Sequence, residues 1–308
     1  MTKYIVSGYI GFDNFGDEAI ASVLVEKLKK EEAECITLIS SNPAKTSEIH
    51  SVNSCGMFEF LIPLLKSDVL ISGGGSLLQD VTSLKSLIYY LGVIYTALFL
   101  GKKVEIFAQG IGPINSKIGQ VLTKFALKRA DKISVRDKKS QELLNEWGIS
   151  SELVKDPVLE IELPVLNKKG TVGVQLRSFK SVPDGFLPKL KDEIKRNFAN
   201  KEIIVFSLQD KVDLEICSAF ETMLNSAGLR TKLVYKLDIN SATALIANLE
   251  YLVAMRFHAN VIGIKAGVKT LAINYDPKVE KLAEEYNLPC INLEQEDFSK
   301  EFDQLKSR

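Results

Sequence analysis

The chain has 308 residues, which predicts two domains, because a single hydrophobic core stops growing near ~250–300 residues. Hydrophobic residues make up 46% of it and charged residues 25%, as in an ordinary soluble globular protein. The 39 basic residues balance the 39 acidic ones. The chain therefore lacks the basic excess of a nucleic-acid-binding protein, and we expect no nucleic-acid partner.

The start of the chain runs directly into a strand pattern at Tyr4 and lacks the long apolar region of a signal peptide. No pair of the four cysteines has the spacing of metal ligands. These features indicate a cytoplasmic protein with incidental reduced thiols and no metal site.

Residues 1–158 alternate short apolar runs with helix-length segments, which predicts an N-terminal domain. The expected strands are Tyr4–Gly8, Cys35–Ile39, Val69–Ile71, Val104–Ala108 and Lys132–Val135. The expected helices are Gly16–Lys30, Ser76–Leu100, Ser116–Ala130 and Lys138–Trp147. Unbroken apolar strands between helices are typical of a parallel sheet covered on both faces.

The most apolar segment, Leu87–Leu100, falls short of the ~20 residues that span a bilayer. We expect a buried helix here. The alternative is peripheral contact with a membrane or with a lipid-linked substrate.

A linker with two prolines, Asp156–Lys169, precedes a second domain at residues 168–308. Its expected strands are Thr171–Leu176, Glu202–Leu208, Thr231–Val234, Tyr251–Ala254 and Lys269–Ile273. Its expected helices are Pro188–Phe198, Asp213–Ser226, Ser241–Asn248, Ala259–Ala266 and Lys278–Tyr286. A last helix, Gln295–Lys306, could pack on this domain or back on the first. The fold class is thus α/β, with two Rossmann-like doubly wound domains facing a cleft, as in the glycosyltransferase-B (GT-B) arrangement. Ligands of such sheets bind outside the carboxyl ends of the strands.

Two glycine-containing loops follow strands of the first domain and are candidates for binding an acceptor. Glycine allows tight turns and close approach of the backbone to a ligand. The first loop offers Gly11, Asn14, Gly16 and Asp17, and the second offers Gly73, Gly74, Gly75, Gln79 and Asp80. In the first loop, Asp17 and Glu18 would repel a phosphate, so that loop suits a sugar hydroxyl. Asp17 and Glu18 could instead only complement a helix dipole.

Cationic side chains follow other strands and are candidates for binding an anion. They are Arg136, Arg177 and Arg256, the last of which precedes His258 by two residues. Arginine supplies a planar fork for phosphate or carboxylate, and histidine can transfer a proton near neutral pH. Each could also be structural. The other histidine, His50, lies in a polar segment, and we expect it at the surface.

Several of these segments occur in the order of one known family. These segments resemble the polysaccharide pyruvyl transferase family, and most of all its CsaB type. They are GYIGFDNFGDEAI, GGGSLLQDVTS, FAQGIGP, SVRD and MRFHANVIG. The resemblance covers nearly the whole chain. It implies a transferase that moves pyruvate from phosphoenolpyruvate, with no cofactor, onto two hydroxyls of a sugar.

The resemblance also implies an acceptor sugar and a separate substrate-binding role for each domain. The sugar would be of the N-acetylmannosamine type, in a cell-wall polysaccharide that anchors S-layer proteins or in its lipid-linked precursor. The second domain would bind the donor, with Arg256 and His258 on the family's Arg-x-His and either Arg136 or Arg177 as a further arginine. The first domain would bind the acceptor, and His258, Arg256 and Asp17 would be catalytic. Two alternatives stay open: a nucleotide-sugar glycosyltransferase of GT-B fold, and a carbohydrate-binding protein without activity. The oligomeric state is left open.

Overall fold

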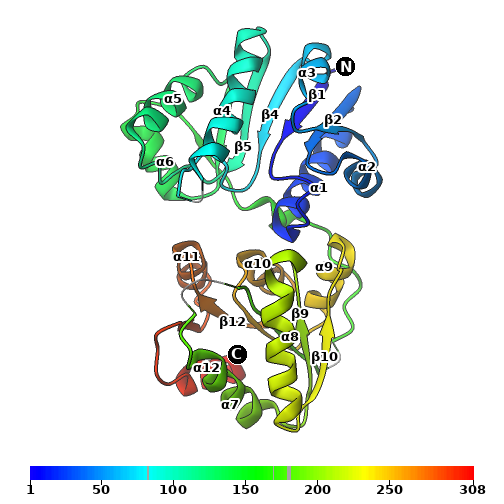
Figure 1. The fold of residues 1–308 in the computed structure, drawn as a ribbon, viewed down its shortest axis with the longest axis vertical. Helices are drawn as coiled ribbons and strands as arrows, with labels where there is room; N and C mark the ends of the chain where they lie inside the picture. The colour runs from blue at the N-terminus through cyan, green and yellow to red at the C-terminus, as the bar shows by residue number, and fades with distance from the viewer. Residues whose placement is uncertain (82, 169, 179–181) are drawn as a thin grey trace. The chain divides into compact units, whose positions relative to one another are not determined.

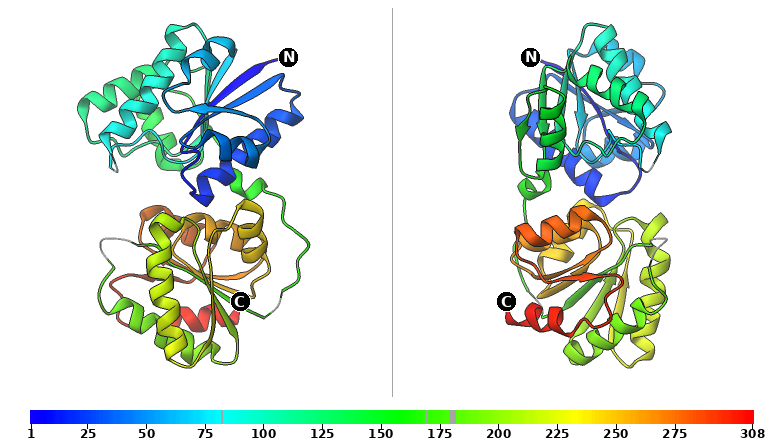
Figure 2. Two further views of the ribbon diagram at one scale, coloured as in Figure 1. Left: turned by 45° about the vertical axis from the view of Figure 1, so that its right-hand side comes forward. Right: turned by 90° about the vertical axis from the view of Figure 1, so that its left-hand side faces the viewer.

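A computed structural model of the chain describes residues 1–81, 83–168, 170–178 and 182–308. It divides into two compact units, Met1–Ile161 and Glu162–Arg308. Each unit is built on one sheet with helices on both of its faces (Figures 1 and 2). The division falls within the proline-containing segment Asp156–Lys169.

The first unit holds a sheet of order β3-β2-β1-β4-β5-β6-β7, and its neighbouring strands pair in parallel. Its strands are β1 Lys3–Ser7, β2 Cys35–Ser40, β3 Asn53–Gly56, β4 Val69–Gly73, β5 Lys103–Gln109, β6 Lys132–Val135 and β7 Glu152–Leu153. Its helices are α1 Phe15–Lys30, α2 Pro43–His50, α3 Leu61–Lys66, α4 Leu84–Phe99, α5 Lys117–Leu127, α6 Lys138–Glu146 and the 3₁₀ turn η1 Pro157–Glu160.

The second unit repeats the plan with a sheet of order β10-β9-β8-β11-β12-β13, again parallel. Its strands are β8 Val172–Gln175, β9 Glu202–Phe206, β10 Arg230–Val234, β11 Tyr251–Ala254, β12 Lys269–Asn274 and β13 Cys290–Asn292. Its helices are α7 Phe186–Phe198, α8 Asp210–Ser226, α9 Ile239–Ala247, α10 Phe257–Lys265, α11 Pro277–Glu285 and α12 Ser299–Ser307. The expected doubly wound α/β fold is confirmed in both units.

The last helix, α12, packs against β12 and α7 of the second unit (Figure 1). Phe302 and Leu305 are fully buried in the hydrophobic core of that unit. Of the two placements that the sequence left open for this helix, packing back on the first domain is therefore wrong.

The prediction of one long helix over Ser76–Leu100 is wrong at its start. Helix α4 begins only after Ser83, whose hydroxyl accepts the backbone N–H of Ser86 and so caps the helix. Upstream, within the predicted range, Leu78 forms an isolated parallel β-bridge with Ile111, which excludes a helix at this position.

Each sheet has one point where the chain order reverses, and this point directs attention to particular loops. The first sheet runs from β1 through β2 to β3 and resumes with β4 on the other side of β1. The second runs from β8 through β9 to β10 and resumes with β11 beside β8. Open α/β sheets bind ligands at the carboxyl ends of the strands that flank this switch point. The loops after β1 and β4, and those after β8 and β11, are therefore the first places to look for a site.

Candidate functional site

The loop after β1 is held by two residues whose roles the sequence did not reveal. Gly11, at a φ of 84°, donates its N–H to Oε1 of Glu18 at 2.7 Å. The other oxygen of this buried carboxylate, Oε2, lies 3.3 Å from Nε2 of His50. His50 is only 4% exposed, so its expected surface position is wrong. It ends helix α2, a short element that carries too weak an apolar pattern to be recognised.

Asp17 stands where the loops after β1 and β4 meet. Its Oδ2 accepts an N–H from Nδ2 of Asn14 at 2.5 Å, and Asn14 also caps α1 by accepting the N–H of Gly16 at 3.2 Å. A Cβ at Gly75 would lie 2.6 Å from Oδ1 of Asp17, so only glycine lets the second loop approach this carboxylate. The two expected acceptor loops are thus brought together within the first unit.

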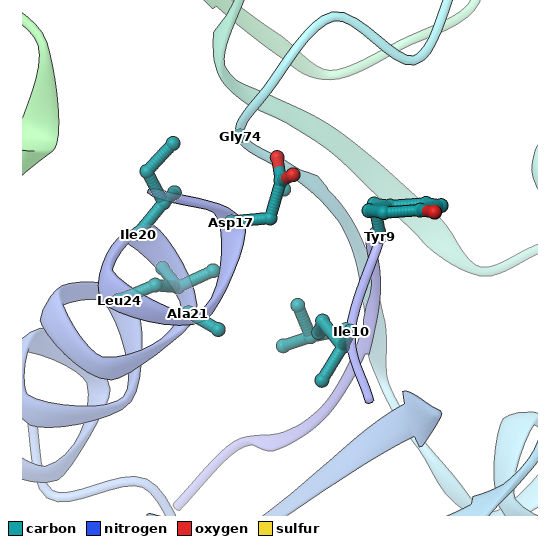
Figure 3. Close-up of a pocket in the computed structure, with 9 residues that line it drawn as sticks. Tyr9, Ile10, Asp17, Ile20, Ala21, Leu24 and Gly74 are labelled. Atoms are coloured by element: carbon teal, nitrogen blue, oxygen red, sulfur yellow. The ribbon is translucent and has the colours of Figure 1, made fainter. Parts of the chain in front are cut away.

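A small cavity lies beside this carboxylate, between helix α1 and the ends of β1 and β4 (Figure 3). In Figure 3 the side chain of Asp17 lies beside Gly74, and the ring of Tyr9 lies at the opposite side of the cavity. Its volume of about 10 Å³ matches one water molecule. The cavity could hold a water against Asp17 but not a sugar, so an acceptor would have to bind in the open space outside it.

Tyr90 of α4 is a further polar group at this edge that the sequence did not single out. Burial raises the pKa of its hydroxyl, and the negative charge of Asp17 raises the same pKa further. The hydroxyl donates to the carbonyl oxygen of Gly8 at 3.4 Å. Tyr90 is therefore a protonated donor that supports the β1 loop.

The loop after β4 is tied to the loop after β5 by backbone hydrogen bonds. Gly74 donates to the carbonyl of Phe107 at 2.8 Å, and Gly110 donates to the carbonyl of Gly75 at 2.9 Å. Gly73 ends β4, and Gln79 is half-buried near the end of the loop. These bonds give the glycine-rich backbone one defined path despite its intrinsic freedom.

Asp80, a candidate for binding acceptor hydroxyls, is engaged by the backbone. Its two carboxylate oxygens accept the N–H groups of Asn115 and Ser116 at 2.8 and 2.7 Å. These hydrogen bonds lower the pKa of Asp80 below its usual value. The geometry makes Asp80 an anchor for the chain entering α5.

Arg136, one of the two candidates for the further donor arginine, already has a counter-charge. Its Nη1 lies 2.8 Å from Oδ2 of Asp156, and both side chains are largely buried. Its Nη2 donates to Oγ of Ser76 at 3.2 Å, which links the end of β6 to the glycine-rich loop. This arrangement stabilises the loop and leaves Arg136 with little net charge to offer an anion.

Arg256, at the end of β11 in the second unit, is also neutralised. Its Nε lies 2.5 Å from Oδ2 of Asp213, and its Nη2 donates to Oδ1 of the same carboxylate at 2.8 Å. Asp213 belongs to helix α8 and is fully buried, and Arg256 is only 7% exposed. Asp213 was not identified from the sequence as a partner of Arg256. Its position in the sequence indicates only a polar residue on a helix and does not reveal the distant arginine that it contacts.

Two glutamines complete this buried network at the second switch point. Gln209 accepts from Nη2 of Arg256 at 2.8 Å. Gln175, at the end of β8, accepts the backbone N–H of Arg256 at 2.8 Å and donates to Asp213 at 3.3 Å. Side chains that follow β8, β9 and β11 thereby fix the residue that caps helix α10.

Arg177, after β8, differs from the other two arginines. Its Nη1 donates to the hydroxyl of Tyr275, which follows β12, at 3.1 Å. Its Nε is buried without a hydrogen-bond partner, and no carboxylate in the described part of the chain forms an ion pair with it. Arg177 therefore keeps a positive charge that no described carboxylate neutralises.

His258 lies in the first turn of helix α10, two residues beyond the capping Arg256. Its half-buried ring packs edge-on against Phe257, with ring centroids 5.1 Å apart. The amino end of a helix carries partial positive charge and unpaired N–H groups. Because β8 and β11 are neighbours, Arg177 and this helix end flank the same switch point. This edge is suited to an anion, with an imidazole beside it.

No cluster of three or more His, Cys, Asp or Glu side chains with the arrangement of metal ligands occurs among the described residues. None of the helices in that part of the chain is long and apolar enough to cross a membrane.

Solved structures similar to this chain define its class as a two-domain α/β protein of GT-B-like fold. A putative UDP-N-acetylglucosamine 2-epimerase from Listeria monocytogenes matches 100% of this chain and 89% of its own, at 13% identity and a TM-score of 0.65. The UDP-GlcNAc 2-epimerase of Methanocaldococcus jannaschii matches 100% and 92%, at 13% identity and a TM-score of 0.66. Anabaena HepE in complex with UDP-glucose matches 100% and 89%, at 12% identity and a TM-score of 0.63. Identities this low establish the fold alone.

The family is established from the sequence. A family model described as polysaccharide pyruvyl transferase matches residues 14–277, which include every candidate site residue except Gly11. The chain therefore belongs to the polysaccharide pyruvyl transferase family, a family of transferases. No curated protein matches the chain.

Proposed function

We propose that this protein transfers pyruvate from phosphoenolpyruvate onto two hydroxyls of a sugar, forming a cyclic ketal. The acceptor would be an N-acetylmannosamine-type unit of a cell-wall polysaccharide, or its lipid-linked precursor, as in CsaB-type members. The observation that carries the proposal is the second switch point, where Arg177, without an acidic partner, lies beside the helix end that bears His258.

Phosphoenolpyruvate presents a carboxylate and a phosphate on one three-carbon unit. The guanidinium of Arg177 supplies a charge-assisted donor for such an anion, and the amino end of α10 supplies a second positive region. Arg256 acts differently from the expectation, because Asp213 occupies its fork. It is a positioning residue that holds the start of α10 and thereby His258. Arg136 has its own partner in Asp156, so Arg177 is the better candidate for the further arginine.

The chemistry needs one proton donor and one acceptor. His258 protonates the methylene carbon, which leaves C2 electrophilic, and one sugar hydroxyl attacks C2 while Asp17 accepts its proton. The C2–O bond to phosphate then breaks, and the second hydroxyl closes the ring while its proton passes to the now neutral imidazole of His258. The released phosphate takes up the proton that Asp17 accepted. The products are the ketal and inorganic phosphate, and the scheme uses no metal or cofactor. Asp17 suits acceptance because its carboxylate lies where the loops after β1 and β4 meet, beside the amide of Asn14 and the backbone of Gly75.

The decisive experiment is mass spectrometry of candidate glycans incubated with the protein and phosphoenolpyruvate. We expect a mass gain equal to one pyruvyl ketal, together with release of phosphate. The variant His258→Ala should lose this gain while keeping the circular dichroism and melting temperature of the wild type. Normal turnover by that variant would remove the histidine from the mechanism.

The same preparation separates the two alternative functions. Thermal stabilisation by a nucleotide sugar but not by phosphoenolpyruvate would identify a glycosyltransferase instead. Saturable glycan binding without release of phosphate from any donor would identify a carbohydrate-binding protein. Either result would overturn the proposal.

A further inference from the structure

Helix α4 is apolar on both of its faces. Its inner face is buried in the core of the first unit through Leu87, Leu91 and Ile94. The expected buried helix is confirmed for this inner face only, because the outer face is exposed. That face carries residues spaced by three or four positions: Leu84, Ile88, Gly92, Tyr95 and Phe99. Ile88 is 56% exposed and Phe99 is 90% exposed, although a single helix face of this kind normally turns polar residues to solvent.

Helix α5 extends this apolar surface. It packs beside α4 (Figure 1), and Tyr95 of α4 stacks on Phe125 of α5 with ring centroids 6.0 Å apart. Ile118 and Val121 of α5 are exposed by 73% and 67%. We call the exposed side chains of these two helices the α4–α5 face. Large exposed apolar patches of this kind mark interaction sites.

The two segments that form the α4–α5 face carry only positive charges. Segments 84–104 and 116–130 contain no Asp or Glu, although acidic and basic residues are equal in number over the whole chain. They contain seven cations, three in the first segment and four in the second: Lys85, Lys102, Lys103, Lys117, Lys124, Lys128 and Arg129. The guanidinium of Arg129 lies 3.4 Å from the centre of the Phe125 ring, so a cation covers an apolar side chain at the edge of the face.

The chemistry of this face distinguishes between its possible occupants. A second copy of the chain related by a two-fold axis would place the same face against itself. The cations of the two copies would then oppose each other with no carboxylate from either segment between them, which disfavours association. An anionic lipid surface matches both the apolar side chains and the positive charges of this face. The apolar side chains insert at the boundary between headgroups and acyl chains, while Lys and Arg contact the negatively charged headgroups. Each such cation near the surface raises membrane partition about fivefold.

We infer that the α4–α5 face docks the protein on an anionic membrane surface. This inference rests on the exposed apolar stripes and the one-sided charge, and it is independent of the proposed reaction. Neither helix is used by the donor edge of the second unit, so docking can be tested without measuring activity.

The test is co-sedimentation of the full chain with two kinds of vesicle. One consists of phosphatidylcholine alone, and the other of equal parts phosphatidylcholine and phosphatidylglycerol. We expect binding to the anionic vesicles only, weakened by added salt because exposed charges are screened. The variant Val121→Asp should reduce this binding at least tenfold, as should the double variant Lys128→Glu/Arg129→Glu.

Two matched controls keep the result specific to the face. Val165→Asp changes a valine that is 94% exposed in the second unit, and Lys211→Glu reverses an exposed charge on α8. Both should bind like the wild type, and all variants should keep the wild-type melting temperature. Equal binding to both vesicles, no binding to either, or equal effects of controls and face variants would overturn the inference. So would a dimer in solution that Val121→Asp dissociates, since a second copy would then cover the face.

Discussion

The two switch points occupy the same position in their sheets but use opposite means to build a site. In the first unit, the backbone conformation forms the site, because glycines at positive φ bring two loops together around the carboxylate of Asp17. In the second unit, side-chain contacts form the site. Asp213, Gln175 and Gln209 bind Arg256, whereas no described carboxylate neutralises Arg177. The comparison teaches that one topology can present either an acidic, hydroxyl-binding edge or a cationic, anion-binding edge.

The difference predicts that the second edge depends most on a single buried charge. Asp213→Ala should lower the free energy of unfolding of the second unit by about 3–5 kcal/mol, because the guanidinium of Arg256 stays buried without its counter-charge. Chemical denaturation measures this loss.

Asp210→Ala, at the half-buried start of the same helix, is the control and should cost much less. The double variant Asp213→Leu/Arg256→Met, which removes both charges, should recover much of the loss. If Asp213→Ala cost no more than Asp210→Ala, the buried pair would not be what holds this edge.

The first edge should depend instead on the absence of a side chain. A Cβ on Gly74 would lie 2.1 Å from Cγ2 of Ile20, whereas a Cβ on Gly101 would meet open space. Both glycines have similar positive φ angles, 59° and 66°. Gly74→Ala should therefore destabilise the first unit by roughly 1–3 kcal/mol more than Gly101→Ala, since only the former adds a clash to the backbone strain. Equal melting temperatures for the two variants would show that the loops tolerate a shift.

The assignment of Arg177 as the free cation is tested by a conservative change. Arg177→Lys should raise KM for phosphoenolpyruvate about tenfold with a smaller change in kcat, because an ammonium cannot reproduce the planar fork. Arg230→Lys, on the exposed strand β10, is the matched control and should leave KM unchanged. An unaltered KM in Arg177→Lys would return Arg136 to consideration.

The smallest effect concerns Asp80 and depends on pH. Its pKa is lowered by the N–H groups of Asn115 and Ser116, so its contribution to stability is present above the usual value of 3.8 and is lost as pH falls through the lower value of the folded state. Asp80→Asn should therefore melt below the wild type at neutral pH, and the gap should close in acid.

Asp192→Asn changes a carboxylate whose side chain is 69% exposed and should show no such gap. A gap in Asp80→Asn that persists unchanged at acidic pH would exclude the carboxylate charge as its source.

Much of this protein was determined by local sequence pattern. Alternating apolar runs and helix-length segments predicted both parallel sheets, because buried parallel strands need unbroken apolar sequence. Glycine loops and arginines after the strands marked the two edges, since the carboxyl ends of parallel strands share one side of a sheet. Family membership followed from motifs that are contiguous in the chain.

What only the tertiary structure decided were the partners of charged groups. Asp213 and Arg256 lie 43 residues apart, Asp156 and Arg136 lie 20 apart, and Glu18 and His50 lie 32 apart. No local pattern encodes such pairs, because they depend on how helices and loops pack over the sheet. The fold therefore decides whether an arginine pairs with a buried carboxylate or remains without one. This difference distinguishes Arg177 from Arg136 and Arg256.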